Sequence, residues 1–205
     1  MIKMKKTKKQ IQNEVTREKI LQVSTGFLIS RSYRGTTISS IAKEVGLTKG
    51  AIYHHFKSKE DLVLELVKSV KQTWFKFVGR KVLLEGNSVV RLETLLSVHS
   101  QFLRKDPTMC MVLSSLLSEM EILDHAIIDE IKGIYSEMLT FIRKIIERGQ
   151  TSSELQKDLD AENTAFTIVG ILRWMGCSPL FKLLDFKQDN LVENTIKMLI
   201  NSMKK

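Results

Sequence analysis

The 205-residue sequence predicts an all-α protein in which an N-terminal three-helix unit precedes a larger helical bundle, with about nine helices in all. Apolar residues recur every three or four positions along most of the chain, and no segment alternates over the length of a strand. Pro107, Pro179 and glycines such as Gly86 fall between these periodic segments, where helices stop. We expect two domains, residues 1–58 and 59–205.

Positive charge is concentrated in the N-terminal part of the chain. Residues 1–80 contain 17 Lys and Arg against 6 Asp and Glu, a net charge of +11, whereas the remainder has 15 against 17, a net charge of −2. This local excess indicates a polyanionic partner, and the short helices described below lack the apolar insertion face that a membrane surface requires. Because we find no signal peptide and no apolar run of roughly 20 residues, we expect a cytoplasmic protein with no membrane partner.

The first helix is expected from Thr16, as its N-cap, to about Ser32, with Ile20 and Leu28 facing inward. Residues 1–12 form a lysine-rich lead with little to bury, and we expect this lead to be disordered. It is either a solubilising tail or an arm that contacts DNA phosphates, and we favour the phosphate contact.

The stretch from Thr36 to Asp61 predicts two short helices joined by a sharp turn. The first of them has one apolar stripe, formed by Ile38, Ile41, Ala42 and Val45. Thr37 is its expected N-cap, and Gly46 follows its last apolar residue, where a left-handed conformation ends the helix. Thr48 caps the next helix, whose inward residues include Ile52 and Phe56. This pattern is typical of a helix-turn-helix.

The outer face of that second short helix has side chains that suit DNA. Lys49 can reach guanine acceptors or phosphate, Tyr53 can donate to phosphate oxygens, and Gly50 lets the backbone approach a thymine methyl or a sugar. Lys59 begins the next helix, where its charge and the free N–H groups favour a phosphate. Each residue alone could equally be a solvated surface side chain, but together on one face they favour DNA. The predicted DNA-binding residues are Thr37, Ser39, Thr48, Lys49, Gly50, Tyr53, His54, His55 and Lys59.

At these residues the sequence resembles the TetR family of bacterial transcriptional regulators. The matching pattern comprises Thr36-Thr37-Ile38, Ile41-Ala42, Val45-Gly46-Leu47-Thr48, Gly50, Ile52-Tyr53, His55-Phe56 and Ser58-Lys59-Glu60-Asp61-Leu62. The resemblance implies a DNA-binding regulator whose C-terminal region binds an inducer and forms a dimer through a four-helix bundle. The chemical identity of the inducer does not follow from the resemblance, because this region varies widely in the family.

Beyond residue 58 the periodic pattern predicts six further helices. They are expected at residues 59–78, 89–104, 108–120, 126–148, 160–177 and 190–203. Gly79 and the Gly86–Ser88 stretch are expected to break the chain after the helix over residues 59–78. Gly149 is expected to end the helix over residues 126–148. The helix over residues 59–78 is the evident mechanical link between the two predicted domains.

No catalytic or metal-binding constellation is evident in the C-terminal part. His99 and His125 are isolated in helical contexts, and no Ser–His–Asp order, glycine-rich phosphate loop or Cys-x-x-Cys spacing occurs. We therefore expect neither enzymatic activity, nor a cofactor, nor a metal. Cys110 and Cys177 are too few for a disulfide framework, and we interpret both as buried thiols.

Large apolar side chains spread over several C-terminal helices either fill a core or line a cavity for a small apolar effector. Core packing is the more common role for most of them. His99 and Arg173 are the polar groups that could orient such a ligand. The predicted pocket residues are Trp74, Phe77, His99, Phe102, Met120, Arg173 and Trp174.

Three hypotheses for the function follow. The first is a homodimeric repressor that a small apolar ligand releases from a palindromic double-stranded operator, with the last two long helices forming the dimer. The second is a regulator of the same fold that acts as an activator or without a small-molecule inducer. The third, an enzyme with an incidental helix-turn-helix, would need converging titratable groups.

Overall fold

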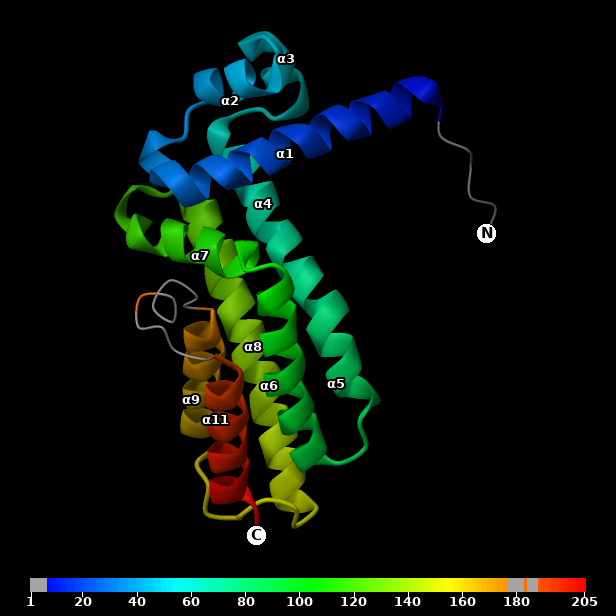
Figure 1. Cartoon of the computed structure of the whole chain (residues 1–205), viewed down its shortest axis with the longest axis vertical. Coiled ribbons are helices and arrows are strands. Elements are labelled where there is room, and N and C mark those ends of the chain that lie inside the picture. Colours follow the sequence, from blue (N-terminus) through cyan, green and yellow to red (C-terminus); the bar gives the residue numbers. More distant parts are fainter. Residues whose placement is uncertain (1–6, 177–182, 184–187) are drawn as a thin grey trace. The chain divides into compact units, whose positions relative to one another are not determined.

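The computed structural model describes residues 7–176, 183 and 188–205, and regular structure in these residues is helical, apart from one isolated antiparallel bridge between Leu155 and Lys204 (Figure 1). The all-α prediction is confirmed. The α-helices are α1 (Lys8–Gly35), α2 (Ile38–Val45), α3 (Lys49–His55), α4 (Lys59–Trp74), α5 (Arg80–Leu84), α6 (Ser88–Lys105), α7 (Thr108–Ser118), α8 (His125–Thr151), α9 (Ala161–Met175) and α11 (Gln188–Met203). A π-helical turn, η1 (Phe75–Gly79), and a 3₁₀ turn, η2 (Met120–Ile122), complete the described elements.

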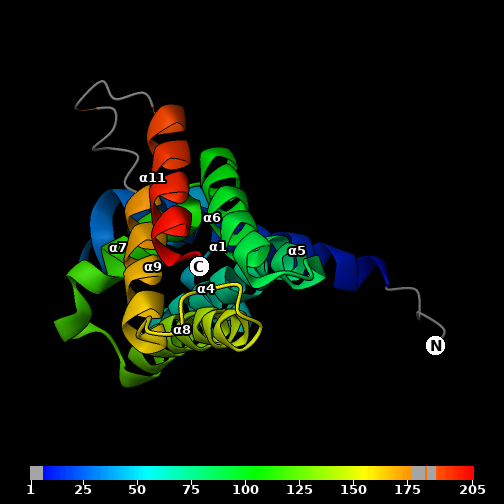
Figure 2. The same ribbon diagram turned by 90° about the horizontal axis from the view of Figure 1, so that it is seen from below.

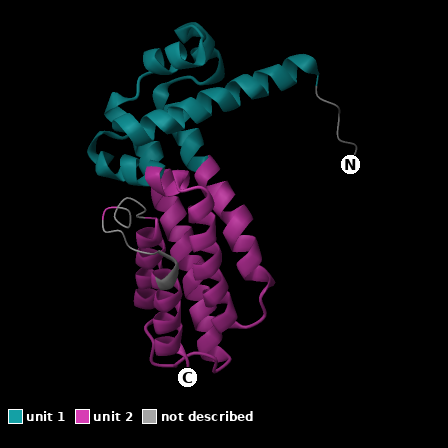
Figure 3. Ribbon diagram, in the orientation of Figure 1, with its two compact units in different colours: residues 1–68, 112–128 teal, residues 69–111, 129–205 magenta. Residues whose placement is uncertain are grey.

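The chain forms two compact units (Figure 3). Unit 1 comprises residues 1–68 and 112–128, and unit 2 comprises residues 69–111 and 129–205. Helices α4, α7 and α8 therefore each contribute residues to both units, whereas the sequence indicated only the helix beginning at residue 59 as a link.

Helix α1 begins earlier than the sequence analysis expected. The predicted disorder of residues 1–12 is wrong for residues 8–12, which are helical, while residues 1–6 lie outside the described part. Thr7 caps the helix by accepting a hydrogen bond from the Gln10 backbone N–H, and the Gln10 side chain accepts one from the Thr7 backbone N–H. This reciprocal capping box satisfies two backbone donors that would otherwise lack partners, so the helix starts at Lys8 and not after Thr16.

The other end of α1 is held by a distant part of unit 1. Ser32 has a positive φ of 59°, which interrupts the regular helix close to its predicted end. The segment 112–128 pairs two backbone groups around this kink. The Arg34 N–H donates to the Glu119 carboxylate (2.9 Å), and the Leu28 carbonyl accepts from the Ser115 hydroxyl (2.6 Å). The Arg34 N–H lowers the pKa of the Glu119 carboxyl most strongly, and hydrogen bonds from the Ser32 side chain and the Tyr33 backbone lower it further.

The predicted helix-turn-helix is confirmed at its caps and its turn. The Thr37 hydroxyl accepts from the Ser40 N–H and the Thr48 hydroxyl accepts from the Ala51 N–H. Gly46 has a φ of 78°, in the left-handed region, and the Leu47 N–H returns to the Ala42 carbonyl (2.8 Å). The stripe from Ile38 to Val45 is buried, as expected, and so are Ile52 and Phe56.

In unit 2 the helix that begins at Lys59 continues past its predicted end. Gly79 was expected to break it, but the chain passes through η1 into α5, burying Val78 and Val82. Likewise α8 runs past Gly149, where a Cβ would lie 2.6 Å from a Leu155 methyl, so this glycine permits close packing and does not end the helix. Helix α6 packs against α5, α9 and α11 (Figure 2). In the described residues no helix has the length and apolar character needed to cross a bilayer.

Candidate DNA-binding surface and effector region

Helix α3 buries one side and exposes the side that the sequence assigned to DNA. Ile52 and Phe56, with 0 % and 1 % of their surfaces exposed, fix the helix in unit 1. Lys49, Gly50 and His54 are exposed, and the Tyr53 ring is 52 % exposed although it is large and partly apolar. The structure thus brings these four predicted residues together on one solvent-facing surface of a short helix.

Gly50 has no structural requirement within the protein. A Cβ at this position would meet only the Thr48 hydroxyl, at 3.8 Å, and the backbone of Gly50 is not left-handed. Glycine within a helix costs about 1 kcal/mol relative to alanine. Close approach of DNA to the helix backbone would account for a glycine here, and this contact of Gly50 stays a prediction.

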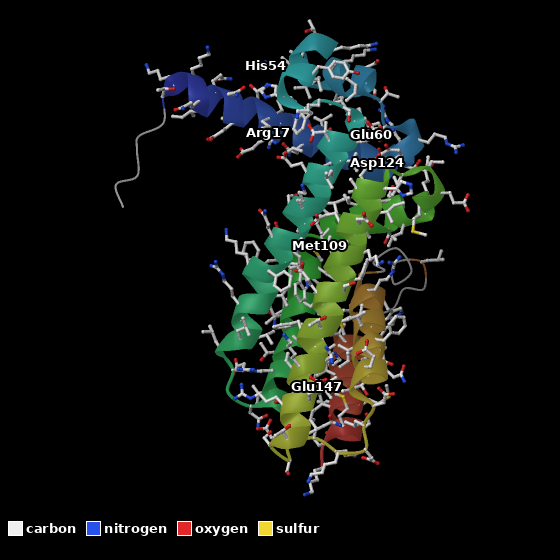
Figure 4. All side chains as sticks on the ribbon, turned by 180° about the vertical axis from the view of Figure 1, so that it is seen from behind. Arg17, His54, Glu60, Met109, Asp124 and Glu147 are labelled. Carbon is white, nitrogen blue, oxygen red and sulfur yellow. The ribbon has the colours of Figure 1, made fainter. Side chains whose placement is uncertain are left out.

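Arg17 of α1 (Figure 4) connects the C-terminal end of α3, the predicted recognition helix, with α4. Its guanidinium lies 4.8 Å from the centre of the Phe56 ring and forms a two-pronged ion pair with Glu65 of α4. His55 is half-buried between its neighbours, and burial, followed by the nearby His54 and Arg17, lowers its pKa. His55 is thus less accessible to DNA than His54.

The remaining predicted DNA contacts surround α3. Thr37, Ser39 and Thr48 are exposed at the N-terminal ends of α2 and α3. Lys59 also has a structural contact that the sequence did not suggest: its ammonium donates to the Tyr33 carbonyl (2.6 Å) and lies 3.7 Å from the centre of the Tyr33 ring. One of its three donors is committed there, and its phosphate contact stays a prediction.

The centre of unit 2 contains a buried chain of hydrogen bonds between three helices. The Trp74 indole N–H donates to Nδ1 of His99 (3.0 Å), and Nε2 of His99 lies 3.0 Å from the Leu172 carbonyl oxygen. Since a carbonyl can only accept, Nε2 carries the proton and the imidazole is neutral. Burial lowers the pKa of His99 to about 4, and the hydrogen bond to Leu172 opposes this shift in part. We call this Trp74–His99–Leu172 chain of hydrogen bonds the His99 relay. A ligand could form a hydrogen bond with either ring nitrogen of His99 only by breaking the relay.

The other predicted pocket residues are distributed unevenly. The Phe77 and Phe102 rings stack 5.9 Å apart, and the Arg173 guanidinium donates to the Tyr135 hydroxyl (3.0 Å). Trp174 is half-buried in α9. Met120 lies in η2 within unit 1, with 48 % of its surface exposed, so it does not belong to the cluster around Trp74.

Two aromatic neighbours of Trp74 lie outside the predicted set of pocket residues: Phe141, which the sequence indicated only as one of the apolar side chains of the bundle, and Phe75, which it did not indicate at all. The Phe75 ring lies 5.0 Å and the Phe141 ring 6.3 Å from the Trp74 ring, both edge-on. The same two phenylalanines line a groove of about 360 Å³ together with Glu137 and Lys144. Phe75 escaped notice because the π-helical turn, which no local pattern announced, changes which residues after Trp74 face inward.

Cys110 is half-exposed, not buried as predicted, and Cys177 lies outside the described residues. Among the described residues no group of three or more His, Cys, Asp or Glu side chains is placed to hold a metal ion.

A helix-turn-helix with an exposed, basic recognition face defines a DNA-binding regulator. Comparison with known families agrees: residues 20–66 match the bacterial regulatory proteins of the tetR family, and residues 88–190 match the tetracyclin repressor-like C-terminal domain. The chain belongs to the TetR family and is a DNA-binding transcriptional regulator.

Two curated relatives extend over most of the chain. The nucleoid occlusion factor SlmA of Marinomonas sp. is 25 % identical over 76 % of this chain and 78 % of the relative. The HTH-type transcriptional repressor KstR2 of Rhodococcus jostii is 26 % identical over 78 % of this chain and 76 % of the relative.

Solved structures share the fold at lower identity. AibR, solved with isovaleryl coenzyme A and operator DNA, has a TM-score of 0.75 at 18 % identity and covers 90 % of this chain and 98 % of its own. FadR from Bacillus subtilis, solved with stearoyl-CoA, has a TM-score of 0.72 at 19 % identity and covers 89 % of this chain and 97 % of its own.

Proposed function

We propose that this protein is a repressor that binds a palindromic operator as a homodimer and is released from it by a small apolar ligand. The observation that carries the DNA half of the proposal is the exposed face of α3, where Lys49 and Tyr53 flank a glycine that the fold itself does not need. A relative named as a repressor, KstR2, supports the sign of the regulation. As a regulator that binds operator DNA, the protein would act in the cytoplasm and without catalysis.

The dimer is supported by exposed apolar side chains on the two helices that the sequence assigned to it. Phe166 on α9 and Met198 on α11 each expose 68 % of their surface. On α9, Gly170 lies one turn beyond Phe166 and has open space around its Cα. A palindrome is bound by a protein with matching twofold symmetry, because one short recognition helix makes too few base contacts alone.

For the effector we propose a molecule with an apolar acyl chain, such as an acyl thioester, whose chain enters unit 2 beside Trp74. The solved structures of AibR and FadR contain acyl-CoA molecules in the same fold. Here a ligand would meet the Phe75 and Phe141 rings and would have to compete with the Trp74–His99 hydrogen bond. Because Trp74 ends α4, whose first turn lies in unit 1, a displacement at Trp74 can pass along one continuous helix.

The first test is recognition of a specific duplex. Duplexes selected from a random pool with the wild-type protein should be palindromic, and Lys49→Ala should lose about 1–3 kcal/mol of preference at one base pair if Lys49 reads a guanine. The variant should keep its helical circular dichroism, since Lys49 is exposed. A pool that shows no enrichment would remove the DNA half of the proposal.

The second test uses the selected duplex and a series of acyl-CoAs of increasing chain length. A ligand that weakens DNA binding tenfold must favour the released state by about 1.4 kcal/mol, and DNA must weaken ligand binding by the same factor. Trp74 fluorescence reports ligand entry independently of release. A ligand that changes this fluorescence without changing DNA affinity would contradict the release mechanism while leaving DNA recognition intact.

The alternative, a regulator of this fold that works as an activator or without an inducer, is favoured by one observation. The polar groups of Trp74 and His99 already satisfy one another, so this part of unit 2 needs no ligand to complete it. The name of one relative, nucleoid occlusion factor SlmA, also describes a role other than that of a ligand-released repressor.

A further inference from the structure

A groove in unit 1 lies between the first turns of α1 and the recognition helix. It has a volume of about 620 Å³, and only one of its lining residues, His54, comes from α3. The lining side chains from the N-terminal part of the chain include Thr7, Lys9, Gln12, Asn13 and Thr16. His54 follows Tyr53 directly and both are exposed, so the groove adjoins the surface that faces DNA in the proposed function.

The residues of α1 that line this groove occupy one side of the helix. With 3.6 residues per turn, positions 9, 12, 13 and 16 fall on the side that, further along, buries Ile20 in the core. That side is therefore apolar where α1 packs within unit 1 and polar where it overhangs beside His54. Both acidic residues of these turns, Glu14 and Glu18, lie on the opposite side with the exposed Ile11 and Val15.

The chemistry of the groove selects its ligand. Its lining contains an ammonium, amides, hydroxyls and an imidazole, and none of the side chains that line it is acidic. Such donors, with lysine, are the groups that contact phosphate oxygens of a DNA backbone. Each of the residues that line it carries a polar or charged group, and none has a purely hydrocarbon side chain.

The helical form of this segment also needs an explanation. Residues 7–15 are all exposed, so packing against the core does not stabilise these turns of α1. The Thr7–Gln10 capping box fixes the start of the helix, and the Thr16 hydroxyl donates to the Gln12 carbonyl (2.9 Å). The result is a preformed helix whose polar side is already positioned beside α3. Binding there therefore costs little conformational entropy.

We propose that the groove between α1 and His54 binds a phosphate of the DNA backbone beside the site that α3 reads, with Lys9 and Asn13 as its principal donors. This inference rests on the proposed DNA binding and adds a second contact surface to it. Because phosphates carry no base identity, this surface adds affinity and fixes orientation without adding sequence preference.

The decisive comparison uses two substitutions that add the same charge to opposite sides of α1. Asn13→Asp places a carboxylate in the groove, whereas Val15→Asp places one on the far side, two residues away. Losing one phosphate contact costs about eightfold in affinity at 0.1 M salt, since one contact contributes roughly 0.9 to the salt slope. We expect Asn13→Asp in the full-length protein to weaken binding of the selected duplex by at least about eightfold, and Val15→Asp by less than about threefold.

Lys9→Ala tests the phosphate assignment. It should reduce the slope of log affinity against log salt by about one, equally on the selected duplex and on a scrambled duplex of the same length. Circular dichroism of each variant shows whether α1 is retained. Equal weakening by Asn13→Asp and Val15→Asp would mean that only net charge matters and would overturn the proposal, as would no effect of either.

The proposed function can fail separately from this inference. If wild-type protein selects no duplex, the proposed function fails. If wild type selects a duplex and Lys49→Ala loses preference for it, but Asn13→Asp behaves like Val15→Asp, only the groove assignment fails. A change in sequence preference caused by Lys9→Ala would indicate a base contact and would also overturn the phosphate assignment.

Discussion

Replacing His99 by glutamine should remove the part of the pH dependence of the free energy of unfolding that comes from this histidine. In the folded protein the neutral imidazole accepts from Trp74 and donates to the Leu172 carbonyl. A proton added at Nδ1 would face the indole N–H, so the folded state resists protonation, whereas an unfolded chain does not. A glutamine can accept through its amide oxygen and donate through its amide nitrogen, but it does not titrate.

The size of the effect follows from the two pKa values. Burial lowers the pKa of His99 from 6.5 to about 4 in the folded state. Above pH 6.5 neither state binds the proton and this histidine contributes no pH dependence. As the pH falls from 6.5 to 4, only the unfolded state gains the proton, so the free energy of unfolding decreases by about 3 kcal/mol and then levels off.

Urea unfolding of the wild type and of His99→Gln at a series of pH values from 8 to about 4 measures this effect. Trp74 and Trp174 both lie in unit 2, so their fluorescence reports on the unit that contains His99. Other acid-sensitive groups are common to both proteins and cancel when the two free energies are subtracted. His125→Gln, at the exposed start of α8, controls for the removal of one imidazole.

We expect the advantage of the wild type over His99→Gln to decrease by about 3 kcal/mol between pH 6.5 and pH 4. A difference that stays constant over this range would show that His99 titrates normally in the folded protein. The buried relay would then be an incorrect description of the centre of unit 2, whether or not the variant is less stable at neutral pH.

Two further predictions concern Lys59 and the dimer. Lys59→Met should lower the free energy of unfolding by about 1–2 kcal/mol, because it removes the hydrogen bond to the Tyr33 carbonyl and the contact with its ring; an unchanged urea midpoint would contradict this. If Lys59 also contacts a phosphate, the same variant should bind operator and scrambled duplexes more weakly by the same factor. Met198→Glu should give monomers in sedimentation at micromolar concentration with helical content retained, since Met198 is exposed; a dimer that survives would exclude this face of α11.

The helix-turn-helix was predictable because its determinants are local. Thr37 and Thr48 cap helices and Gly46 forms the turn, each within four residues of its own position, as the sequence predicted. The early start of α1 was predictable in principle, since Thr7 and Gln10 have the spacing of a capping box, although the lysine-rich composition of this segment favours disorder.

Other features depend on contacts that no local pattern contains. The contact of Lys59 with Tyr33 joins residues 26 positions apart, and the His99 relay joins α6 to a carbonyl 73 residues away. The sequence therefore identified His99 as a polar group of interest but could not show that both its nitrogens are already occupied. The π-helical turn is a similar case, since Val78 and Gly79 are buried in it and Gly79 does not break the chain as the local pattern predicted.

The composition of unit 1 has a consequence for how such regulators can be recombined. A graft that transfers only residues 1–68 to another regulator would leave behind the partners of the Arg34 N–H and the Leu28 carbonyl, which belong to residues 115 and 119. The DNA-reading module is thus encoded in two separate stretches of the gene, 43 residues apart along the chain. A working chimera requires both stretches from the same parent, or a recipient whose own α7 supplies an equivalent serine and glutamate.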